Sequence, residues 1–346
     1  MSIVFIGVAL TGVVDTWRSK WPADELHRRG IDAYYIGHQG EHTNRGWVHD
    51  DTYIVHATNQ DVGLYGTVKE LRSLGAKVWV QFDDDYRQLG IIQDTVDHDL
   101  IPLVAAMPHT KKFRPRGWFE NLTDDHRTGL AAADGFIAAT EEVADAYRDW
   151  ARGPTVVIHN YIPSWVTELP LKRIMPPVAG WFGGLGAHRR DIEWLGESGK
   201  AIGRLGVIGD PAGVEEIIGR QLDYRAGWQA WSKLYREIGR FSVGIVPVVD
   251  DAFNRPKSWI KPVEFAAMGV PSVVSDLPAY RRARDRGLPL VIVDNPEAMA
   301  DEANLILDDV EGFAPHDVLR QIVRDQFSLE GPGGDDWEKW AVEYSQ

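Results

Sequence analysis

The sequence contains no cysteine. This absence excludes disulfide bonds, thiolate metal sites and cysteine nucleophiles, and it permits a reducing compartment. The chain also lacks an excess of basic residues, since its formal net charge is −14. That balance argues against a broad nucleic-acid-binding surface but leaves room for a local basic groove. No uncharged apolar run reaches the length of a membrane span. The apolar start SIVFIGVALTGVV has no basic region before it and no cleavage site, so we expect a buried first strand and a cytoplasmic protein.

What the sequence does contain is an alternation of short apolar runs and longer amphipathic ones over 346 residues. This alternation predicts parallel sheets with helices on both faces, and the length predicts two domains. In the first half we expect strands at Ile3–Val8, Ala33–Ile36, Tyr53–His56, Lys77–Phe82, Gly135–Ala138 and Val156–His159. In the second half we expect them at Val178–Phe182, Arg204–Ile208, Leu222–Tyr224, Val243–Pro247, Ser272–Ser275 and Leu290–Val293.

Helical patterns lie between these runs. We expect helices at Trp21–Arg29, Gly66–Leu74, Glu141–Ala151, Asp191–Gly199, Trp228–Ile238, Ile260–Met268, Pro296–Leu307 and Asp335–Tyr344. The proline-rich segment Ile162–Pro177 is interpreted as a linker. Segment Leu89–Asn121 is long, polar and irregular, which is typical either of a functional insertion or of a variable surface loop.

The stretch FNRPKSWIKPVEFAAMGVPSVVSD, residues 253–276, places two lysines and a glutamate at spacings of four and three. On a helix, Lys257, Lys261 and Glu264 would share one face. Such a face can present cations to a diphosphate and a carboxylate to ribose hydroxyls. By spacing alone, a solvated helix face is the more economical interpretation.

This stretch resembles the nucleotide-sugar motif of family 4 and related glycosyltransferases of the GT-B fold. In that family a helix carrying a glutamate is followed by a Gly-Val-Pro turn and a valine-rich strand. The pattern FN-x-x-KS-x-x-K-x-x-E matches a subgroup, and it assigns donor contacts to Lys257, Ser258, Lys261 and Glu264. The resemblance implies that Glu264 binds the ribose and that the two lysines face the diphosphate or its sugar. Many members carry a second glutamate eight positions earlier, where this chain has Pro256.

The stretch WFGGLGAHRRDIEWL, residues 181–195, runs from an apolar strand into a glycine-rich turn. Glycines let backbone N–H groups approach an anion, and the start of the next helix favours negative charge. In position, this stretch resembles the G-x-x-x-H-x-x-D turn of the same glycosyltransferases. The resemblance adds Gly183, Gly184, His188 and Arg189 to the donor site. Arg189 or Arg190 would clamp a phosphate, and Asp191 would cap the turn.

Three consecutive aspartates, Asp83 to Asp85, follow the apolar strand of VWVQFDDDYRQL. The run includes D-x-D, the metal motif of the other large glycosyltransferase fold, but the two-domain pattern does not suit that fold. A carboxylate at this position can orient or deprotonate an acceptor hydroxyl. We therefore expect Asp84 and Asp85 to be catalytic, with a capping role at a strand end as the structural alternative.

Three further segments carry weaker signals. Gly12 lies in the loop after the first strand, which borders the ligand site in such sheets. Aromatic residues within Tyr224–Trp231 suit either the donor base or the core. Thr140 and Asn160 match family positions that mostly build the end of the first domain.

Together, the order of these motifs predicts an α/β protein of the GT-B fold, with two doubly wound, Rossmann-like domains. We expect an acceptor-binding domain at 1–165, a nucleotide-sugar-binding domain at 173–328, and a segment 329–346 whose helix crosses back to the first domain. The resemblance implies transfer of a sugar from a nucleotide diphosphate sugar, expected to be a UDP-sugar, to an acceptor hydroxyl, without a metal ion and with retention of configuration. No cofactor is expected, and the donor is a substrate.

Several alternatives stay open. The acceptor is a glycan, a small molecule or a protein, and the acidic balance disfavours hydroxymethylated DNA, the acceptor of similar phage enzymes that would work in a host cytoplasm. If an aspartate acts as the base in direct displacement, inversion follows instead of retention. A catalytically degenerate nucleotide-sugar-binding protein, a phosphorylase and an epimerase of similar fold are the other readings.

Overall fold

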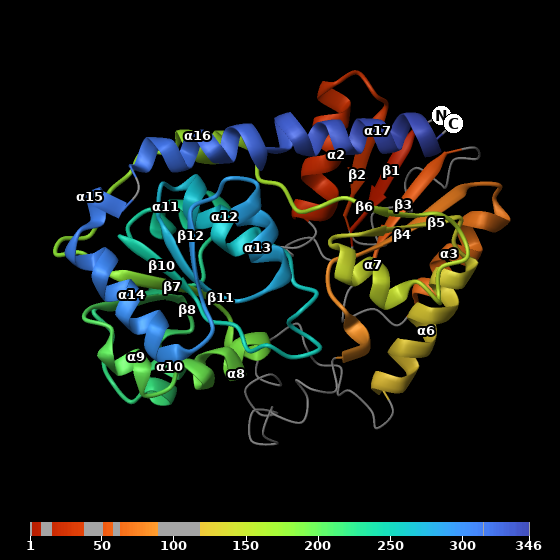
Figure 1. Ribbon diagram of the computed structural model, residues 1–346. Helices are drawn as coiled ribbons and strands as arrows, with labels where there is room; N and C mark the ends of the chain where they lie inside the picture. The colour runs from red at the N-terminus through yellow and green to blue at the C-terminus, as the bar shows by residue number, and fades with distance from the viewer. Residues whose placement is uncertain are drawn as a thin grey trace. The chain divides into compact units, whose positions relative to one another are not determined.

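The computed structural model describes residues 2–7, 16–37, 51–57, 63–88, 118–313 and 315–345. The chain forms two compact units, Met1–Asn160 with Gly333–Gln346, and Tyr161–Pro332. Each unit contains one parallel sheet of six strands (Figure 1). Gly12 and most of the irregular segment Leu89–Asn121 lie outside the described residues. Among the described residues, no helix is both long and apolar enough to cross a membrane.

The sheet of the first unit has the strand order β2-β1-β3-β4-β5-β6. Its strands are β1 (Ile3–Ile6), β2 (Ala33–Ile36), β3 (Thr52–His56), β4 (Lys77–Phe82), β5 (Gly135–Ala138) and β6 (Thr155–Val157). Helical segments in this unit are η1 (Thr16–Lys20), α2 (Trp21–Arg28), α3 (Leu64–Ser73), η3 (Tyr86–Gln88), α6 (Trp118–Ala132), α7 (Glu141–Tyr147) and α17 (Gly334–Tyr344). The central strands β1, β3, β4 and β5 are almost entirely buried, because helices cover both faces of such a sheet.

Helix α17 belongs to the first unit although it ends the chain. It packs beside α2, and its aromatic residues reach the sheet. The ring of Trp337 lies 5.2 Å from that of Phe5, and the ring of Trp340 lies 5.3 Å from that of Trp79. Both tryptophans are buried, so the last helix closes one face of the core of this unit.

The sheet of the second unit has the order β12-β11-β10-β7-β8-β9. Its strands are β7 (Ala179–Gly183), β8 (Leu205–Gly209), β9 (Tyr224–Gly227), β10 (Val243–Val246), β11 (Ser272–Ser275) and β12 (Leu290–Val293). Its helical segments are η5 (Ser164–Glu168), α8 (Leu185–Leu195), α9 (Ser198–Ala201), α10 (Pro211–Ile218), α11 (Trp231–Ile238), α12 (Ile260–Ala267), α13 (Pro278–Asp285), α14 (Pro296–Asp308), α15 (Val310–Phe313), α16 (His316–Gln326) and η6 (Leu329–Gly333), which ends at the boundary of the units. Helices cover both faces of this sheet (Figure 1).

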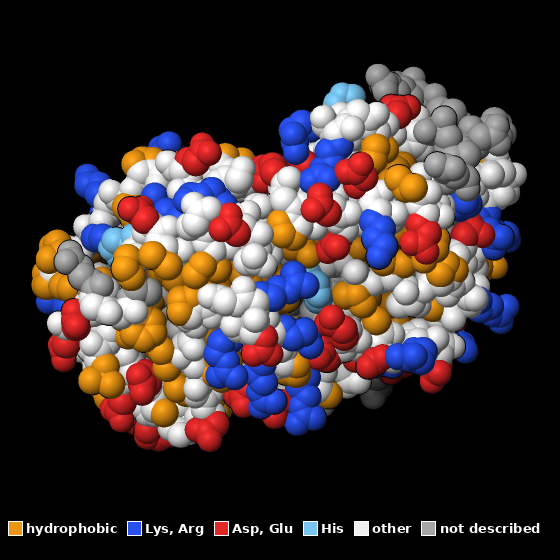
Figure 2. Space-filling model, turned by 45° about the horizontal axis from the view of Figure 1, so that its top comes forward, with side chains coloured by type: hydrophobic (Ala, Val, Ile, Leu, Met, Phe, Trp, Pro, Cys, Tyr) orange, Lys and Arg blue, Asp and Glu red, His pale blue; other side chains and the backbone are white. Residues whose placement is uncertain are grey.

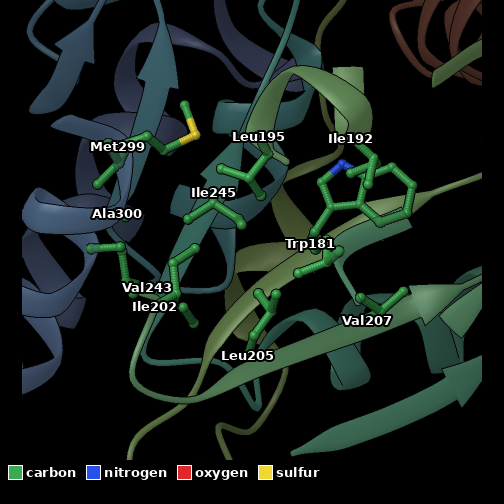
Figure 3. Packing of buried hydrophobic residues seen from close by; sticks show 14 of the residues in the cluster. Trp181, Ile192, Leu195, Ile202, Leu205, Val207, Val243, Ile245, Met299 and Ala300 are labelled. Carbon is green, nitrogen blue, oxygen red and sulfur yellow. The ribbon is translucent and has the colours of Figure 1, made fainter. Parts of the chain in front are cut away.

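One hydrophobic core cluster of the second unit lies between the sheet and the helices α8, α10 and α14. Figure 3 shows Trp181 and Val207 from adjacent strands pointing toward Ile192 and Leu195 of α8. Trp181 pairs with Val207 in the ladder between β7 and β8. This packing fixes the carboxyl end of β7, where the glycine-rich turn begins.

Every predicted strand is present, five of them with the predicted limits and the others with limits that differ by at most three residues, and the helices depart more. The predicted helix Asp191–Gly199 is wrong, because α8 already begins at Leu185 and ends at Leu195. Its first turn contains Gly186. Helix α6 begins at Trp118, inside the segment expected to be irregular. Helices α10, α13, α15 and α16 were not predicted.

Truncation of Trp337 tests the contribution of α17 to the fold. We expect Trp337→Ala to lower the free energy of unfolding of the first unit by about 3–5 kcal/mol, as buried large-to-small substitutions do. Urea denaturation followed by far-UV circular dichroism measures this. Val342→Ala on the same helix is the control, since Val342 is 61% exposed. Equal effects of the two substitutions would contradict this packing role.

Candidate donor site in the second unit

The carboxyl ends of β7 and β8 meet at two glycines, Gly183 and Gly209. Gly209 has φ +122°, and a Cβ there would lie 2.1 Å from the carbonyl oxygen of Gly183. Only glycine fits this position, because any side chain would collide with backbone. Gly184 follows as the N-cap of α8, and this helix has eleven residues. The predicted Gly183–Gly184 turn therefore opens a helix whose first N–H groups have no partner within it.

His188 lies in the second turn of α8, between a carboxylate and an ammonium group. Its Nδ1 lies 2.7 Å from Oδ2 of Asp191, and its Nε2 lies 3.3 Å from Nζ of Lys261. Burial, together with the charges of Lys257 and Lys261, lowers the pKa of His188 to about 3. A neutral ring that donates from Nδ1 to Asp191 has an acceptor at Nε2, and Lys261 donates to it.

We had predicted that Asp191 caps the glycine turn. Its side chain instead contacts the loop after β10. Its Oδ1 accepts hydrogen bonds from the backbone N–H of Val249 at 2.9 Å and from Nδ2 of Asn254 at 3.1 Å. Burial opposes ionisation, but the hydrogen bonds from His188 and Val249 and the charge of Lys257 outweigh it and lower the pKa of Asp191. The buried carboxylate thus joins α8 to the segment that carries Lys257.

The predicted common helical face of Lys257, Lys261 and Glu264 is wrong in one respect. Helix α12 begins at Ile260, so Lys257 precedes it in a turn where its N–H donates to the carbonyl of Asn254. Lys257 Nζ lies 4.9 Å from the ring centroid of Phe253. Ser258 Oγ accepts from the N–H of Ile260 at 3.4 Å. The turn nevertheless brings the two lysines close enough for each charge to act on the same histidine.

Lys261 is half-buried against aromatic rings. Its Nζ lies 5.4 Å from the ring centroid of Trp181 and 5.7 Å from that of Phe182. A Cβ on Gly183 would lie 3.2 Å from this nitrogen, so the ammonium sits beside the glycine turn. Burial and the charge of Lys257 lower the pKa of Lys261 to about 8. The group is therefore cationic at neutral pH.

Glu264 lies one turn further along α12 and is fully buried. Its Oε1 accepts a hydrogen bond from the hydroxyl of Tyr235 at 3.1 Å. Among the residues that the structure describes, no group donates to its Oε2. Burial raises the pKa of Glu264 to about 8, against the lowering effects of Tyr235 and Lys261. A buried polar atom without a hydrogen-bond partner is costly and calls for a ligand or another explanation.

The arginines predicted to clamp a phosphate are engaged elsewhere. Nε of Arg189 pairs with Glu193 at 2.8 Å, and Nη1 of Arg190 pairs with Asp251 at 2.7 Å. From the sequence, Trp228 suited a core position at least as well as a contact with the donor base. Its side chain is 55% exposed, and a Cβ on Gly184 would lie 3.2 Å from its indole ring. An exposed ring beside the turn was not recognisable from apolarity alone.

In the first unit, the three aspartates after β4 have different surroundings. Asp85 is buried in a two-point ion pair with Arg87, at 2.7 and 2.8 Å. Asp84 is half-buried. Asp83, which we had not selected, accepts a hydrogen bond from the hydroxyl of Tyr86 and lies 3.7 Å from Nε2 of His56. Burial opposes the ionisation of Asp83, but the contacts with His56 and Tyr86 lower its pKa overall.

Thr140 and Asn160, which carried weaker sequence signals, make structural contacts. Thr140 caps α7 by accepting from the N–H of Val143. Asn160 Oδ1 accepts from Nη1 of Arg18 at 3.2 Å, and the same nitrogen donates to the carbonyl of Ile158 at 2.6 Å. Within the described ranges, no group of three or more histidine, aspartate or glutamate side chains is arranged to hold a metal ion.

The raised pKa of Glu264 makes stability depend on pH with a defined sign. Between pH 4.5 and 8 the folded carboxyl keeps its proton while the unfolded one loses it, so stability falls as pH rises. Glu264→Gln has no proton to lose. We expect its melting temperature, relative to wild type, to rise by roughly 3 °C or more between pH 5 and pH 8. Calorimetry measures this, and Glu216→Gln, at an exposed position of α10, is the control. A difference that stays constant across this range would refute the burial argument.

No protein-family model and no curated protein matches the sequence. Similarity to known proteins is found instead among solved structures. Sucrose-phosphate synthase from Thermosynechococcus elongatus superimposes with a TM-score of 0.66 at 14% identity, covering 99% of this chain and 98% of that one. HepE from Anabaena, solved with UDP-glucose, has a TM-score of 0.64 at 11% identity and 99% coverage of both chains. A glycosyltransferase from Rickettsia africae has a TM-score of 0.60 at 13% identity, again with 99% coverage of both. At such identities the similarity concerns the fold alone, and that fold is GT-B, as predicted.

Proposed function

We propose that this protein is a glycosyltransferase that moves a sugar from a nucleotide diphosphate sugar to an acceptor hydroxyl. The observation that carries the proposal is that α12 carries both the Lys261 ammonium, which contacts His188, and a buried Oε2 of Glu264 to which no described residue donates. Parallel α/β sheets bind ligands at the carboxyl ends of their strands, where Lys261 lies beside Gly183. A cation for a diphosphate and an acceptor for a ribose hydroxyl match the two polar parts of a nucleotide.

The diphosphate has two kinds of partner in this proposal. Lys257 and Lys261 supply positive charge, and the first N–H groups of α8 supply donors at a helix start, where anions are favoured. In the transition state, charge develops on the leaving diphosphate. Cations fixed at that position stabilise it without reorganisation, so a metal ion is not needed for this role.

The exposed ring of Trp228 is proposed to stack on the nucleobase. It lies beside Gly184, and a Cβ on Gly209 would lie 3.4 Å from it. Bases stack on aromatic side chains with about 1–3 kcal/mol per base. Of the structural neighbours, HepE was solved with UDP and UDP-glucose. This likeness supports UDP as the first nucleotide to test.

The first unit is proposed to bind the acceptor. Of the predicted catalytic residues, Asp84 retains accessible surface, whereas Asp85 is buried in its pair with Arg87. Both oxygens of Asp85 already accept hydrogen bonds from Arg87. We therefore propose that Asp84 orients the acceptor hydroxyl. The resemblance to family 4 supports retention of configuration, whereas Asp84 acting as a base in direct displacement would give inversion.

The nature of the acceptor is proposed from charge. On the face in Figure 2, several lysine and arginine side chains gather in the lower middle, and elsewhere they are interspersed with aspartate and glutamate. A polyanionic acceptor such as modified DNA favours a continuous basic surface. The mixed charge supports a glycan, a small molecule or a protein as the acceptor.

Loss of the Lys261 charge tests the donor site. We expect Lys261→Met to weaken UDP binding about 10- to 100-fold, since hydrogen bonds to charged groups contribute about 1.5–3 kcal/mol. Isothermal titration calorimetry at pH 7 measures the affinity. Lys200→Met removes an exposed lysine of the same unit that pairs with Glu197, and it should bind UDP as wild type does.

Turnover separates the remaining alternatives. A glycosyltransferase releases UDP from a UDP-sugar when a suitable acceptor is supplied, whereas a phosphorylase consumes or releases inorganic phosphate. A protein that binds UDP but releases none with any acceptor would be a degenerate relative. Failure of UDP, ADP and GDP alike to bind the wild-type protein at millimolar concentration would refute the donor site.

The role of Trp228 is tested by two ligands that share the phosphates. We expect Trp228→Ala to weaken UDP binding about 10-fold or more, because stacking is lost, and to leave pyrophosphate binding unchanged. Lys261→Met should weaken both. Competition against a fluorescent nucleotide measures each affinity. If Trp228→Ala left UDP affinity at the wild-type value, the base would have to bind elsewhere.

A further inference from the structure

A buried tyrosine occupies one of the two oxygens of the proposed ribose-binding carboxylate. Tyr235 lies in α11, is fully buried, and donates its hydroxyl hydrogen to Oε1 of Glu264 at 3.1 Å. Oε2 of the same carboxyl group is buried and has no donor among the described residues. The two oxygens of Glu264 are therefore not equivalent.

The Tyr235 ring is itself held by two tryptophans. Trp231, at the start of α11, stacks on it with a centroid distance of 5.8 Å and an interplanar angle of 27°. Trp165, in η5, meets it edge-on at 5.9 Å and 80°. A ring fixed by aromatic contacts keeps its hydroxyl in one place with little entropy left to lose. The hydrogen bond to Oε1 is thus built into the packing of the unit before any ligand arrives.

We propose that Tyr235 is a positioning residue, which holds Oε1 of Glu264 so that Oε2 is offered to one hydroxyl of the donor ribose. The inference rests on the proposed function, because it concerns the same site. We expect the site to prefer ribonucleotides over deoxyribonucleotides. Part of that preference is attributed to Tyr235, which need not touch the ligand.

Two physical effects support this role. A carboxylate free to rotate presents either oxygen, whereas one anchored at Oε1 presents a single acceptor in a fixed direction. The tyrosine also acts on charge. Burial alone favours the neutral acid, and donation from Tyr235 favours the ionised form, which accepts hydrogen bonds more strongly. The charge of Lys261, on the same helix, acts on Glu264 in the same direction.

The burial of Glu264 sets a condition on binding. Oε2 has no accessible surface, so a hydroxyl reaches it only when a covering group moves aside. A site of this kind separates ligands strongly, because a nucleotide that lacks the matching hydroxyl leaves the buried oxygen unpaired.

The test pairs the loss of one protein hydroxyl with the loss of one ligand hydroxyl. The affinities of UDP, 2′-deoxy-UDP and 3′-deoxy-UDP are measured by calorimetry for wild type, Tyr235→Phe and Glu264→Gln. We expect wild type to bind UDP about 10-fold or more tighter than at least one deoxy analogue. In Tyr235→Phe this ratio should fall several-fold toward one, while the affinity for that deoxy analogue changes little. Tyr161→Phe, at a buried tyrosine of the same unit that packs against Trp259, is the matched control and should keep the ratio.

The possible outcomes separate the two proposals. A purely structural role for Tyr235 would lower the melting temperature or weaken all three ligands equally, and an unchanged ratio in Tyr235→Phe overturns the inference while the donor site stands. Equal affinity of the wild-type protein for UDP and both deoxy analogues overturns the inference and the ribose role of Glu264, but not the diphosphate site. If wild type binds none of the UDP ligands and none of ADP, GDP and their 2′-deoxy forms, the proposed function fails with it.

Discussion

The buried carboxylate of Asp191 is the constraint on which the proposed donor site depends. It accepts hydrogen bonds from His188 in its own helix and from Val249 and Asn254 in the loop after β10. These bonds join the glycine turn after β7 to the segment that carries both lysines. They also fix the tautomer of His188, because a ring that donates from Nδ1 can only accept at Nε2. Lys261 is the donor to that nitrogen, so its ammonium is placed beside Gly183 by a chain of contacts that begins at one carboxylate.

The first unit uses its carboxylates differently. Asp83 accepts a hydrogen bond from Tyr86, and Asp85 accepts one from Arg87, so both pair with near neighbours in the chain. Such local pairing stiffens the turn after β4, and it leaves the middle aspartate as the one with accessible surface. Three identical side chains in succession thus end in three environments, because each successive residue of a turn points in a new direction. A chemical role can be assigned to one of them only after their directions are known.

Whether the residues of a feature are close together or far apart in the chain explains much of what the sequence could and could not predict. Strands such as Ile3–Ile6 and Gly135–Ala138 are short apolar runs buried on both faces, so composition and length identify them. The motif around Lys261 and Glu264 was recognisable because its residues are close in the chain. Tyr235 lies 29 residues from Glu264, and Asp191 lies 63 residues from Asn254, so neither contact leaves a local pattern.

Trp228 was ambiguous because apolarity does not distinguish a core tryptophan from an exposed platform. The helix start at Ile260 was misplaced because the spacing of Lys257 and Lys261 fits a helix and a turn equally well.

Burial shifts the pKa values of Lys261 and Glu264 in opposite directions, and both end near the same pH. It lowers the pKa of the lysine to about 8 and raises that of the glutamate to about 8. At neutral pH the unliganded pair therefore carries a positive charge on the lysine and a proton on most of the glutamates. An arriving diphosphate meets a cation that its own negative charge stabilises further, since a nearby anion raises the pKa of an ammonium group. The carboxyl group meets no such support from the phosphates, and its ionisation depends on Tyr235 and Lys261. The phosphate-binding charge and the ribose-binding acceptor thus share Lys261, but only the acceptor depends on Tyr235, so the ribose contact can be altered without removing the cation.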